Sequence, residues 1–510
     1  MRPFEVLLLA ACAVAVAGLV LRRRRQAGLP RSPRTRVPGP PLVPRTHGHG
    51  PARVPRTRVP GPALVPRTLV HVPALVPLLA AAVQALAEGL RWQLVPAYAL
   101  AVLCAAARPA RRPRGRVLTA VAGTGLLVVA AVPPLALPVV TFPPPTGPYG
   151  VGTLTYHWKD PDRPETFTPD PRDHREVMAQ IWYPARTDAT SPRAPYLEDA
   201  AAVTPAVARV LGVPEFVLGH LDQVMTNAVP AAPVHPGEPR YPVLVLLHGL
   251  QGFRQAYTFQ AEELASRGYV VAAVDMTYAA AAVVFPGGRR ALYDHRLDDD
   301  AFEDAQVPHL AGDVALALDR LADLGRADPR GVLTGRLDLD RAGVIGQSLG
   351  AIVGSQACSA DARIKACLLE DGYMSEDAVR NGLRQPAMWI TRDAENMRLE
   401  RSRAGGWPEH EIVRYQRTMR QVFASLPAEG YLVLVDGMFH LDMTDGPLMV
   451  APPLAGPLGL SGPIGGARAH EVINTYGTAF FDRVLKGRDV PLRSSGEVRV
   501  YSNGSAGPVP

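Results

Sequence analysis

The sequence predicts an α/β protein in two parts: an all-helical transmembrane region, followed by a globular domain with a mostly parallel central sheet and helices on both faces. Three observations predict this. Apolar runs of four to seven residues alternate with helical patterns between residues 177 and 486, which is typical of parallel sheets. A glycine-flanked serine follows one of these runs. Arginines and long apolar stretches gather before residue 147 and set the first part apart.

The first part, residues 1–146, has the composition of a membrane region. It holds 19 arginines, no lysine and 2 acidic residues, a net +17; because the whole chain carries +7, the rest carries −10. Four apolar stretches approach the roughly 20 residues that a bilayer crossing needs: residues 7–21, 69–87, 94–107 and 117–140. A basic cluster follows the first stretch instead of preceding it, which argues against a cleaved signal peptide. The second and third stretches alone would also suit a soluble helical bundle.

The placement of arginine predicts the orientation of this region. Arginines gather in residues 22–67 and 108–116, which lie on one side if all four stretches span, and arginine-rich loops stay in the cytoplasm. The sequence therefore predicts a multi-pass protein of the cell membrane, in contact with lipids through its N-terminal helices, with an extracytoplasmic globular domain. The positive charge belongs to cytoplasmic loops and does not indicate a nucleic-acid partner.

The Pro/Arg-rich loop at residues 26–68 contains a repeat, in which residues 33–46 recur with small changes as residues 55–68. Two copies of such a segment cannot form a solenoid, so we expect a disordered or polyproline-like loop. Anionic lipid headgroups would attract it. A duplication of coding sequence without function explains the repeat equally well.

The globular domain is expected at residues 147–490, after a stiff spacer of three prolines at 143–145. Residues 491–510 are expected to be a polar C-terminal tail. The expected strands are residues 177–183, 243–247, 269–274, 342–345, 364–369, 388–391 and 431–435. The expected helices are residues 258–267, 308–324, 349–359 and 469–486.

Two of these strands end in turns that suit acyl-transfer chemistry. The strand at 342–345 leads to Gly346-Gln347-Ser348-Leu349-Gly350, a G-x-S-x-G turn that presents serine at the apex of a strand-to-helix corner. The strand at 243–247 ends in His248-Gly249-Leu250. In such folds, backbone N–H groups from the two turns stabilise the oxyanion of a tetrahedral intermediate, which predicts Leu250 and Leu349 as donors. We interpret His248 as a structural imidazole that braces its turn.

A base and an acid are expected after the serine in the chain. His440 follows the strand at 431–435 and is the candidate general base. Two carboxylates stand at the ends of strands after the serine: Asp371 after the first and Asp393 after the second. Either would hold an imidazole in the required tautomer, so position alone leaves both open.

Segments spread over residues 147–487 carry a family resemblance. They are GPYGVG at 147–152, REV at 175–177, IWYP at 181–184, YPVLVLLHGL at 241–250, FR at 253–254, LASRGYVVAAVD at 264–275, the Ser348 turn and LED at 369–371. With these the chain resembles the plasma-type platelet-activating-factor acetylhydrolases and their bacterial relatives among the α/β-hydrolases. The resemblance implies that Asp371 is the acid, and that the base lies in a Gly-x-x-His turn, matched by Gly437 to His440. Phospholipids with short or oxidised acyl chains are the implied substrates.

Two segments depart from the animal members of that family. A charged, helix-patterned insertion lies between Asp393 and Gly430, and its charged residues are Glu400, Arg401, Arg403, Glu409, Glu411, Arg414, Arg417 and Arg420. It is long enough to cap the site, although a solvated helix fits as well. The Pro/Gly-rich residues 447–466 would line the mouth of the site or form a passive loop.

The four cysteines predict little chemistry. Cys12 and Cys104 fall in apolar stretches, and Cys358 and Cys367 are interpreted as buried small hydrophobes, although export would permit a bridge between them. The sequence shows no Cys/His cluster with zinc spacing, so neither a metal nor a cofactor is required. Scarce lysine beside abundant arginine, alanine and proline indicates a bacterial genome rich in GC.

The sequence therefore predicts a membrane-anchored serine hydrolase of carboxylic esters. Ser348 would attack the carbonyl, His440 would carry the proton, Asp371 would orient His440, and the Leu250 and Leu349 amides would hold the oxyanion of an acyl-enzyme pathway. The alternatives are a general carboxylesterase or lipase, a peptidase acting on soluble substrates, and a catalytically silent membrane-anchored binding or scaffold protein.

Overall fold

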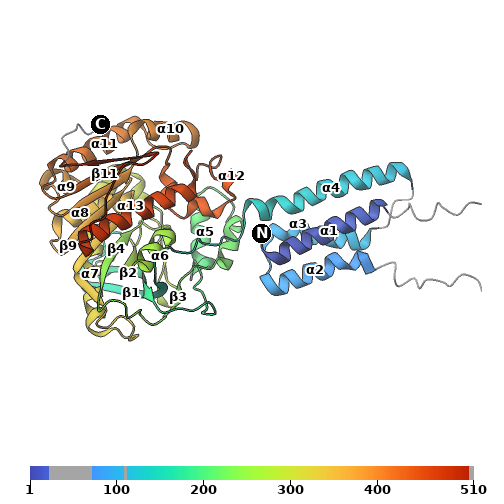
Figure 1. Ribbon diagram of the computed structural model, residues 1–510, viewed down its shortest axis with the longest axis horizontal. Helices are drawn as coiled ribbons and strands as arrows, with labels where there is room; N and C mark the ends of the chain where they lie inside the picture. The colour runs from blue at the N-terminus through green and yellow to red at the C-terminus, as the bar shows by residue number, and fades with distance from the viewer. Residues whose placement is uncertain (22–71, 108–111, 505–510) are drawn as a thin grey trace, which may run out of the picture. The chain divides into compact units, whose positions relative to one another are not determined.

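The computed structural model describes residues 1–21, 72–107 and 112–504, in two compact units, Met1–Pro134 and Leu135–Pro510 (Figure 1). The boundary lies earlier than the one expected at residue 146, because the following segment is fixed to the second unit. Thr146 N donates to Glu263 Oε2 at 2.7 Å, and Gly147 N donates to Ser266 Oγ at 3.0 Å. The Pro/Arg-rich loop at 26–68 lies outside the described residues.

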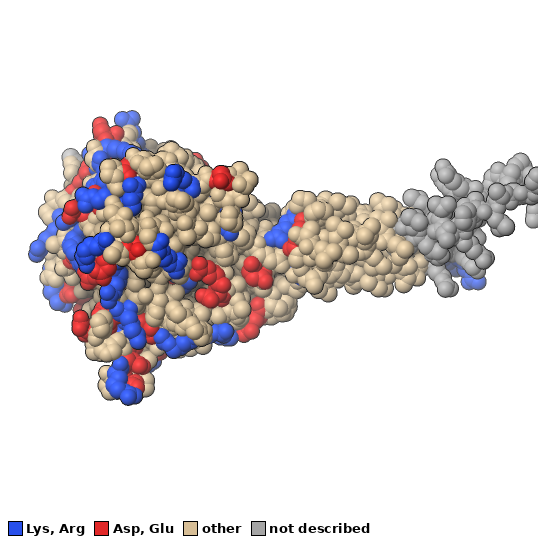
Figure 2. Space-filling view, turned by 90° about the horizontal axis from the view of Figure 1, so that it is seen from below, with Lys and Arg blue, Asp and Glu red and all other residues tan. Residues whose placement is uncertain are grey.

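The described residues of the first unit form four α-helices: α1 (Pro3–Leu21), α2 (Val72–Glu88), α3 (Val95–Ala106), which follows the short turn η2 (Trp92–Leu94), and α4 (Pro113–Ala136). Their core includes Leu8 and Cys12 of α1 and Leu100 of α3. α1 and α4 approach closely where a Cβ added to Gly123 would lie 2.5 Å from the Cγ1 of Val16. Outside this core, many large apolar side chains are exposed, and the face shown in Figure 2 carries almost no charge.

Two of these helices, α1 and α4, are long and apolar enough to cross a membrane, by length and composition alone. α2 and α3 have 17 and 12 residues and are shorter than the roughly 20 that a straight crossing needs. Of the four spans expected from the sequence, the structure therefore supports two. The prolines at positions 73, 77 and 96 belong to the two short helices.

The second unit is built on a ten-stranded sheet with the order β12-β11-β10-β9-β8-β4-β5-β2-β1-β3. Strands β5, β4, β8, β9, β10 and β11 are parallel, whereas β2 is antiparallel to both neighbours and β12 is antiparallel to β11. The strands are β1 (Gly150–Pro164), β2 (His174–Ala185), β3 (Val229–Pro230), β4 (Tyr241–Leu247), β5 (Val270–Asp275), β8 (Leu337–Gln347), β9 (Ile364–Glu370), β10 (Ala387–Thr391), β11 (Gly430–Val435) and β12 (Val498–Ser502). A separate hairpin pairs β6 (Ala282–Val284) with β7 (Arg290–Leu292).

Helices cover both faces of this sheet (Figure 1). Successive side chains of a strand point to opposite faces, so Val243 and Val245 join one core cluster and Leu244 and Leu246 join the other. The first cluster packs under α7 (Asp300–Ala327), α8 (Leu349–Ala360) and α11 (Glu409–Ser425), the second under α6 (Thr258–Ser266) and α13 (Gly466–Lys486). The remaining helices are α5 (Ala200–Val210), α9 (Glu376–Asn381), α10 (Ala394–Ala404) and α12 (Pro452–Ala455). The predicted α/β-hydrolase fold is confirmed.

All seven predicted strands are present, but the expected polar tail is wrong in part. Val498–Ser502 form β12, which pairs with β11 along its whole length. Only Val498 of this strand is buried, because an edge strand rests on the core at few positions. Its mixture of polar and apolar residues therefore resembles a loop in the sequence.

The interpretation of Cys358 and Cys367 as free thiols is also wrong. The two residues form a disulfide bond that joins the last turn of α8 to β9. Only three residues separate α8 from β9, so the chain folds back at once and brings the two side chains together. The cysteines of the first unit, Cys12 and Cys104, are free and buried.

Candidate active site

Ser348 occupies the sharp corner between β8 and α8. Its φ of +56° is rare for a residue with a side chain, and its N–H donates to the Glu370 carbonyl at 2.9 Å. The flanking glycines are required by contact: a Cβ at Gly346 would lie 2.0 Å from the Gly350 carbonyl oxygen, and one at Gly350 would lie 2.2 Å from that of Leu247. The strand, the corner and the helix expected from the G-x-S-x-G motif are all present, and Ser348 is half-buried.

The two predicted oxyanion donors lie on turns that touch. A Cβ at Gly249 would stand 3.1 Å from the Cβ of Ser348, so the turn after β4 packs against the serine. Leu349 begins α8, where the first N–H groups have no partner inside the helix. Within residues 112–504, neither the Leu250 nor the Leu349 N–H donates to a protein acceptor. Both groups are thus available to a negatively charged oxygen beside Ser348.

His248 braces the turn, as interpreted from the sequence. Its ring is completely buried, Nδ1 lies 2.7 Å from the Gly249 carbonyl oxygen, and Nε2 accepts from Met276 N at 2.9 Å. These contacts fit a neutral imidazole protonated on Nδ1. Burial lowers the pKa of His248, which keeps the ring neutral.

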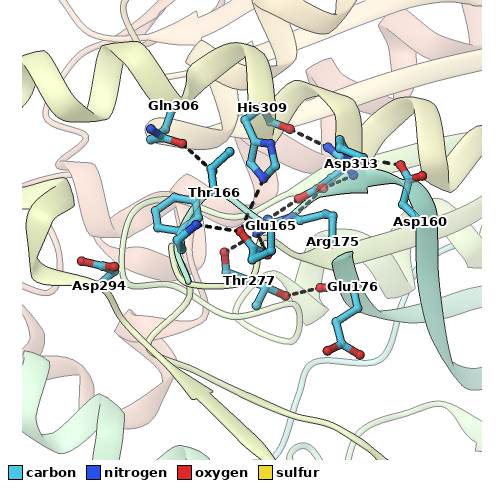
Figure 3. Close-up of polar contacts among 12 residues, drawn as sticks. Asp160, Glu165, Thr166, Arg175, Glu176, Thr277, Asp294, Gln306, His309 and Asp313 are labelled. Carbon is cyan, nitrogen blue, oxygen red and sulfur yellow. Dashed lines mark hydrogen bonds and ion pairs between the residues drawn. The ribbon is translucent and has the colours of Figure 1, made fainter. Parts of the chain in front are cut away.

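A buried ion cluster supports the loop that follows β5 and holds Met276 (Figure 3). Arg175 of β2 donates through Nη1 to the Thr277 carbonyl at 2.9 Å. The same guanidinium contacts Asp313 of α7 at 3.0 and 2.6 Å, and Glu165 at 3.1 Å. Because Arg175 and Asp313 are fully buried, we expect the loss of one partner to be strongly destabilising. Arg175 of the REV segment therefore supports the loop whose Met276 N–H donates to His248 in the turn after β4.

The structure brings His440 together with Asp371. Nδ1 of His440 lies 2.6 Å from Oδ2 of Asp371, which follows β9 with a φ of +48°. Asp393 is engaged elsewhere: its Oδ1 caps α10 by accepting from Asn396 N at 2.9 Å, and its Oδ2 pairs with Arg499 at 2.8 Å. Of the two carboxylates that strand position left open, only Asp371 contacts the imidazole.

Asp371 is surrounded by further polar contacts that were not expected. Thr391 Oγ1 donates to its Oδ1 at 2.9 Å, and the buried Arg392 contacts its Oδ2 through Nε at 3.0 Å and Nη2 at 2.9 Å. Burial alone would raise the pKa of the Asp371 carboxyl. The Arg392 charge and the His440 hydrogen bond outweigh burial and hold that pKa well below its usual range.

His440 is partly exposed, at 18% of its side chain, and contacts several other groups. The edge of Trp407 meets its ring with the centroids 4.9 Å apart. The amide nitrogen of Gln347 lies 3.1 Å from Nε2 and 3.4 Å from Nδ1. Across the described part of the second unit, the Ser348 hydroxyl makes no hydrogen bond, so a side-chain rotation would have to bring Ser348 and His440 into contact for a proton to pass between them.

The charged insertion forms α10 and α11 and packs against the site. Glu400 of α10 is 5% exposed, and its Oε1 accepts from His440 N at 3.1 Å. Trp407 lies between the two helices. The insertion thus reaches His440, and of its eight charged residues named from the sequence only Glu400 is buried. Residues 447–466 lie behind the histidine turn instead, where Gly462 N donates to Asp442 Oδ2 at 2.7 Å and Ile464 N donates to the Gly437 carbonyl at 3.1 Å.

Two other features lie apart from this site. A cavity of about 540 Å³ between residues 143–146 and α13 includes neither Ser348 nor His440 among its lining residues. Asp300, His410 and Glu411 place possible metal-ligand atoms within 4.8 Å of one another, on side chains that are exposed or half-exposed. Carboxylates and imidazole are ordinary ligands of divalent cations, but solvent-exposed groups of this kind are common without one.

Comparisons with known proteins support a hydrolase. Residues 136–286 match the family model of platelet-activating factor acetylhydrolase, isoform II, a segment that ends before Ser348. The platelet-activating factor acetylhydrolase of Cavia porcellus is 24% identical over 373 residues, which cover 68% of this chain and 78% of that protein. The enzyme of the same name from Canis lupus familiaris is 26% identical over 39% of this chain and 52% of its own length. A solved ferulic acid esterase from Streptomyces cinnamoneus is 32% identical, with a TM-score of 0.56 over 70% of this chain and 97% of that one.

Proposed function

The chain belongs to the α/β-hydrolases related to platelet-activating factor acetylhydrolase, and from that premise we propose that it hydrolyses carboxylic esters through Ser348, His440 and Asp371. The observation that carries the proposal is the 2.6 Å contact between His440 and Asp371, beside a serine at a strained strand-to-helix corner. A base oriented by a carboxylate, next to a nucleophile with two unpaired backbone donors, is the arrangement that acyl transfer requires.

In the proposed reaction, Ser348 Oγ attacks the ester carbonyl carbon while His440 Nε2 takes the hydroxyl proton. The Leu250 and Leu349 N–H groups donate to the oxyanion of the tetrahedral intermediate. His440 then returns the proton to the leaving alcohol, and the acyl group remains on Ser348. Water, deprotonated by the same nitrogen, releases the acid and restores the serine. Asp371 keeps the proton of His440 on Nδ1, so that Nε2 is free to act as the base.

We propose short or oxidised acyl chains of phospholipids as the substrate class. The similar proteins from Cavia porcellus and Canis lupus familiaris are named platelet-activating factor acetylhydrolases, which supports this substrate class. The exposed apolar surface of the first unit would also keep the enzyme at a bilayer. The 32% identity to a ferulic acid esterase favours a second candidate, an aromatic carboxylic ester in solution. Both substrates would react through the same acyl-enzyme chemistry. They differ in the acyl and alcohol groups that the site must bind.

We further propose that the protein is anchored in the cell membrane by its N-terminal helices, with the hydrolase unit on the extracytoplasmic side. The two long apolar helices support the anchor. The disulfide between Cys358 and Cys367 supports an oxidising compartment, because cytosolic thiols of most organisms stay reduced. The arginine-rich segments between the apolar stretches favour the same orientation.

The test uses the full-length protein purified in detergent. Hydrolysis of p-nitrophenyl esters from acetate to palmitate, a phospholipid with an acetyl group at its second position, and methyl ferulate is measured for the wild type and Ser348→Ala. Ser359→Ala, on the same helix, is the matched control. We expect turnover that Ser348→Ala abolishes and Ser359→Ala retains, with acetyl esters preferred. Folded protein without serine-dependent turnover on any ester would contradict the proposal, and a preference for methyl ferulate would select the second candidate.

A further inference from the structure

Arg392 and Glu400 place two buried charges around the Asp371–His440 pair. Both Arg392 and the Glu400 carboxylate are almost inaccessible to solvent, with 0% and 7% of their side chains exposed. Arg392 contacts Asp371 through Nε and Nη2, and its Nη1 pairs with Oε2 of Glu400. The buried set therefore contains two carboxylates and one guanidinium. Arg392 is not needed to orient His440, because Asp371 already contacts Nδ1 of His440 directly.

Glu400 links this set back to His440, so that the four residues form a closed cycle of contacts. One of its oxygens pairs with Arg392, and the other accepts from the backbone N–H of His440 at 3.1 Å. His440 is consequently held at two places, by Asp371 on its ring and by Glu400 on its main chain. Gln416 Nε2 donates to the Arg392 carbonyl at 3.0 Å and so ties the guanidinium segment to α11.

We propose that Arg392 and Glu400 are positioning residues of opposite electrostatic effect, which together set the proton affinity of His440. The inference rests on the proposed function, in which His440 is the general base. The positive charge of Arg392 offsets part of the Asp371 charge and so disfavours a protonated His440. The negative charge of Glu400 offsets part of the Arg392 charge and so favours a protonated His440. With both present, Asp371, Glu400 and Arg392 carry a net charge of −1, and the set of four that includes His440 becomes neutral when His440 takes a proton.

The charge balance predicts the sign of each substitution. Arg392→Gln leaves two uncompensated carboxylates near His440 and favours its protonated form. Glu400→Gln leaves one carboxylate and one guanidinium and disfavours that form. The other groups facing His440 are not changed by either substitution. They are Trp407 and the Gln347 amide, which contact the ring, the buried Tyr415 of α11, which contacts Trp407, and the buried Asp442, two residues further along the chain.

The experiment records kcat/KM against pH for the full-length enzyme with p-nitrophenyl acetate, normalised to active serines by titration with a fluorophosphonate. The acid limb of that profile reports the proton affinity of the base in the free enzyme. We expect Arg392→Gln to move the limb to higher pH and Glu400→Gln to lower pH, each by about one unit, the low end of the shift that a nearby charge produces. The double variant R392Q/E400Q should return close to the wild type, and Arg392→Lys, which keeps the charge, should move the limb least.

A matched control lies in the same insertion. Arg398 and Glu409 form an exposed pair, with 45% and 50% of their side chains accessible, so Arg398→Gln and Glu409→Gln make the same charge changes where solvent screens them. Neither should move the acid limb.

Shifts of Arg392→Gln and Glu400→Gln in the same direction, or lower kcat without any shift, would overturn the inference and leave only a structural role. If Arg392→Gln does not fold, Glu400→Gln still tests the inference, because an acid limb that stays in place or moves to higher pH would overturn it. Retention of activity in His440→Ala would instead refute the proposed function itself, so the two failures are distinguishable.

Discussion

Asp371 and Asp393 stand at the ends of neighbouring strands, and their contacts differ. Asp371 is buried against His440, Thr391 and Arg392, whereas Asp393 caps α10 and pairs with Arg499 near the surface. A carboxylate that caps a helix contributes to stability, and one that holds an imidazole contributes to rate. The two roles are separable by substitution with asparagine, which preserves shape and removes charge.

We expect Asp371→Asn to lower kcat for p-nitrophenyl acetate by roughly a thousandfold or more, because the amide favours the wrong histidine tautomer. Asp393→Asn should change kcat by less than about threefold and cost roughly 0.5–1 kcal/mol of stability, as a weakened N-cap does. Steady-state kinetics and urea unfolding of both variants check this. A larger kinetic loss in Asp393→Asn than in Asp371→Asn would reverse the assignment.

Glu370, which precedes Asp371, offers a prediction about pH. It is fully buried, and Gln260 Nε2 donates to its Oε1 at 2.7 Å. Burial raises the pKa of Glu370 to about 8. The Asp371 charge also raises this pKa, whereas the hydrogen bond from Gln260 lowers it. An unfolded chain titrates glutamate near 4.3. Between the unfolded pKa and the folded pKa, Glu370 is protonated in the native state and ionised in the unfolded chain. The free energy of unfolding therefore falls as the pH rises through this range.

The melting temperature of the wild type should therefore fall relative to that of Glu370→Gln as pH rises from about 5 to 8, since the glutamine has no proton to lose. Thermal unfolding of both proteins in matched buffers measures the difference. Parallel melting curves across that range would show that Glu370 titrates alike in the folded and unfolded states. Glu376→Gln, an exposed glutamate at the start of α9, serves as the control.

At the scale of elements, the corner between β8, α8 and β9 concentrates the features on which the site depends. β8 delivers Ser348, α8 supplies the Leu349 N–H, and β9 leads to Asp371. The bridge between Cys358 and Cys367 joins the last two of these elements. It closes a short loop, which limits the freedom of the unfolded chain only moderately.

Removing the bridge in C358A/C367A should lower the free energy of unfolding by about 2–3 kcal/mol, the value expected for a loop of about ten residues. The catalytic rate should remain within a few-fold, because neither cysteine contacts Ser348. Urea unfolding with and without reductant provides the internal control: reductant should destabilise the wild type and leave the double variant unchanged. Equal sensitivity of both proteins would mean that the bridge does not form.

The elements that sequence patterns predicted are those whose burial is uniform. The central strands, such as residues 243–247, are covered on both faces and form continuous apolar runs. β12 escaped prediction because an edge strand buries few of its residues, and β1 because its second half is exposed. The serine turn and the histidine turn were predictable because each follows such a buried run.

Arg392 and Glu400 were beyond prediction for a different reason. Glu400 lies within the charged insertion and resembles a surface residue until α10 folds inward, whereas Arg392 stands just before that insertion. The only signal in the sequence is that Arg392 directly follows a buried strand, at the edge where Asp371 also stands. The sequence did not favour the disulfide, because Cys358 and Cys367 belong to a helix and to the next strand. Their side chains become neighbours only when α8 packs on β9.

For the whole molecule, the contrast between its two units predicts how it partitions. The first unit exposes valines and leucines along its helices, while the second has its charges spread over the visible surface (Figure 2). The full-length protein should stay in the membrane fraction after washing with alkaline carbonate, which releases peripheral proteins. A C-terminal alkaline phosphatase fusion should be active if the second unit is extracytoplasmic. Release by carbonate would refute the anchor, and an inactive fusion with an intact anchor would refute the orientation.

The contact between Glu400 and the His440 main chain has a consequence for substrate entry. α10 belongs to the insertion that packs against the site, and its Glu400 supplies one of the two supports of the histidine. A displacement of α10 would take that support away. We therefore expect an ester whose binding displaces α10 to meet a poorly aligned base, and an ester that leaves α10 in place to keep both supports of His440. Size selectivity would then appear in kcat before it appears in KM.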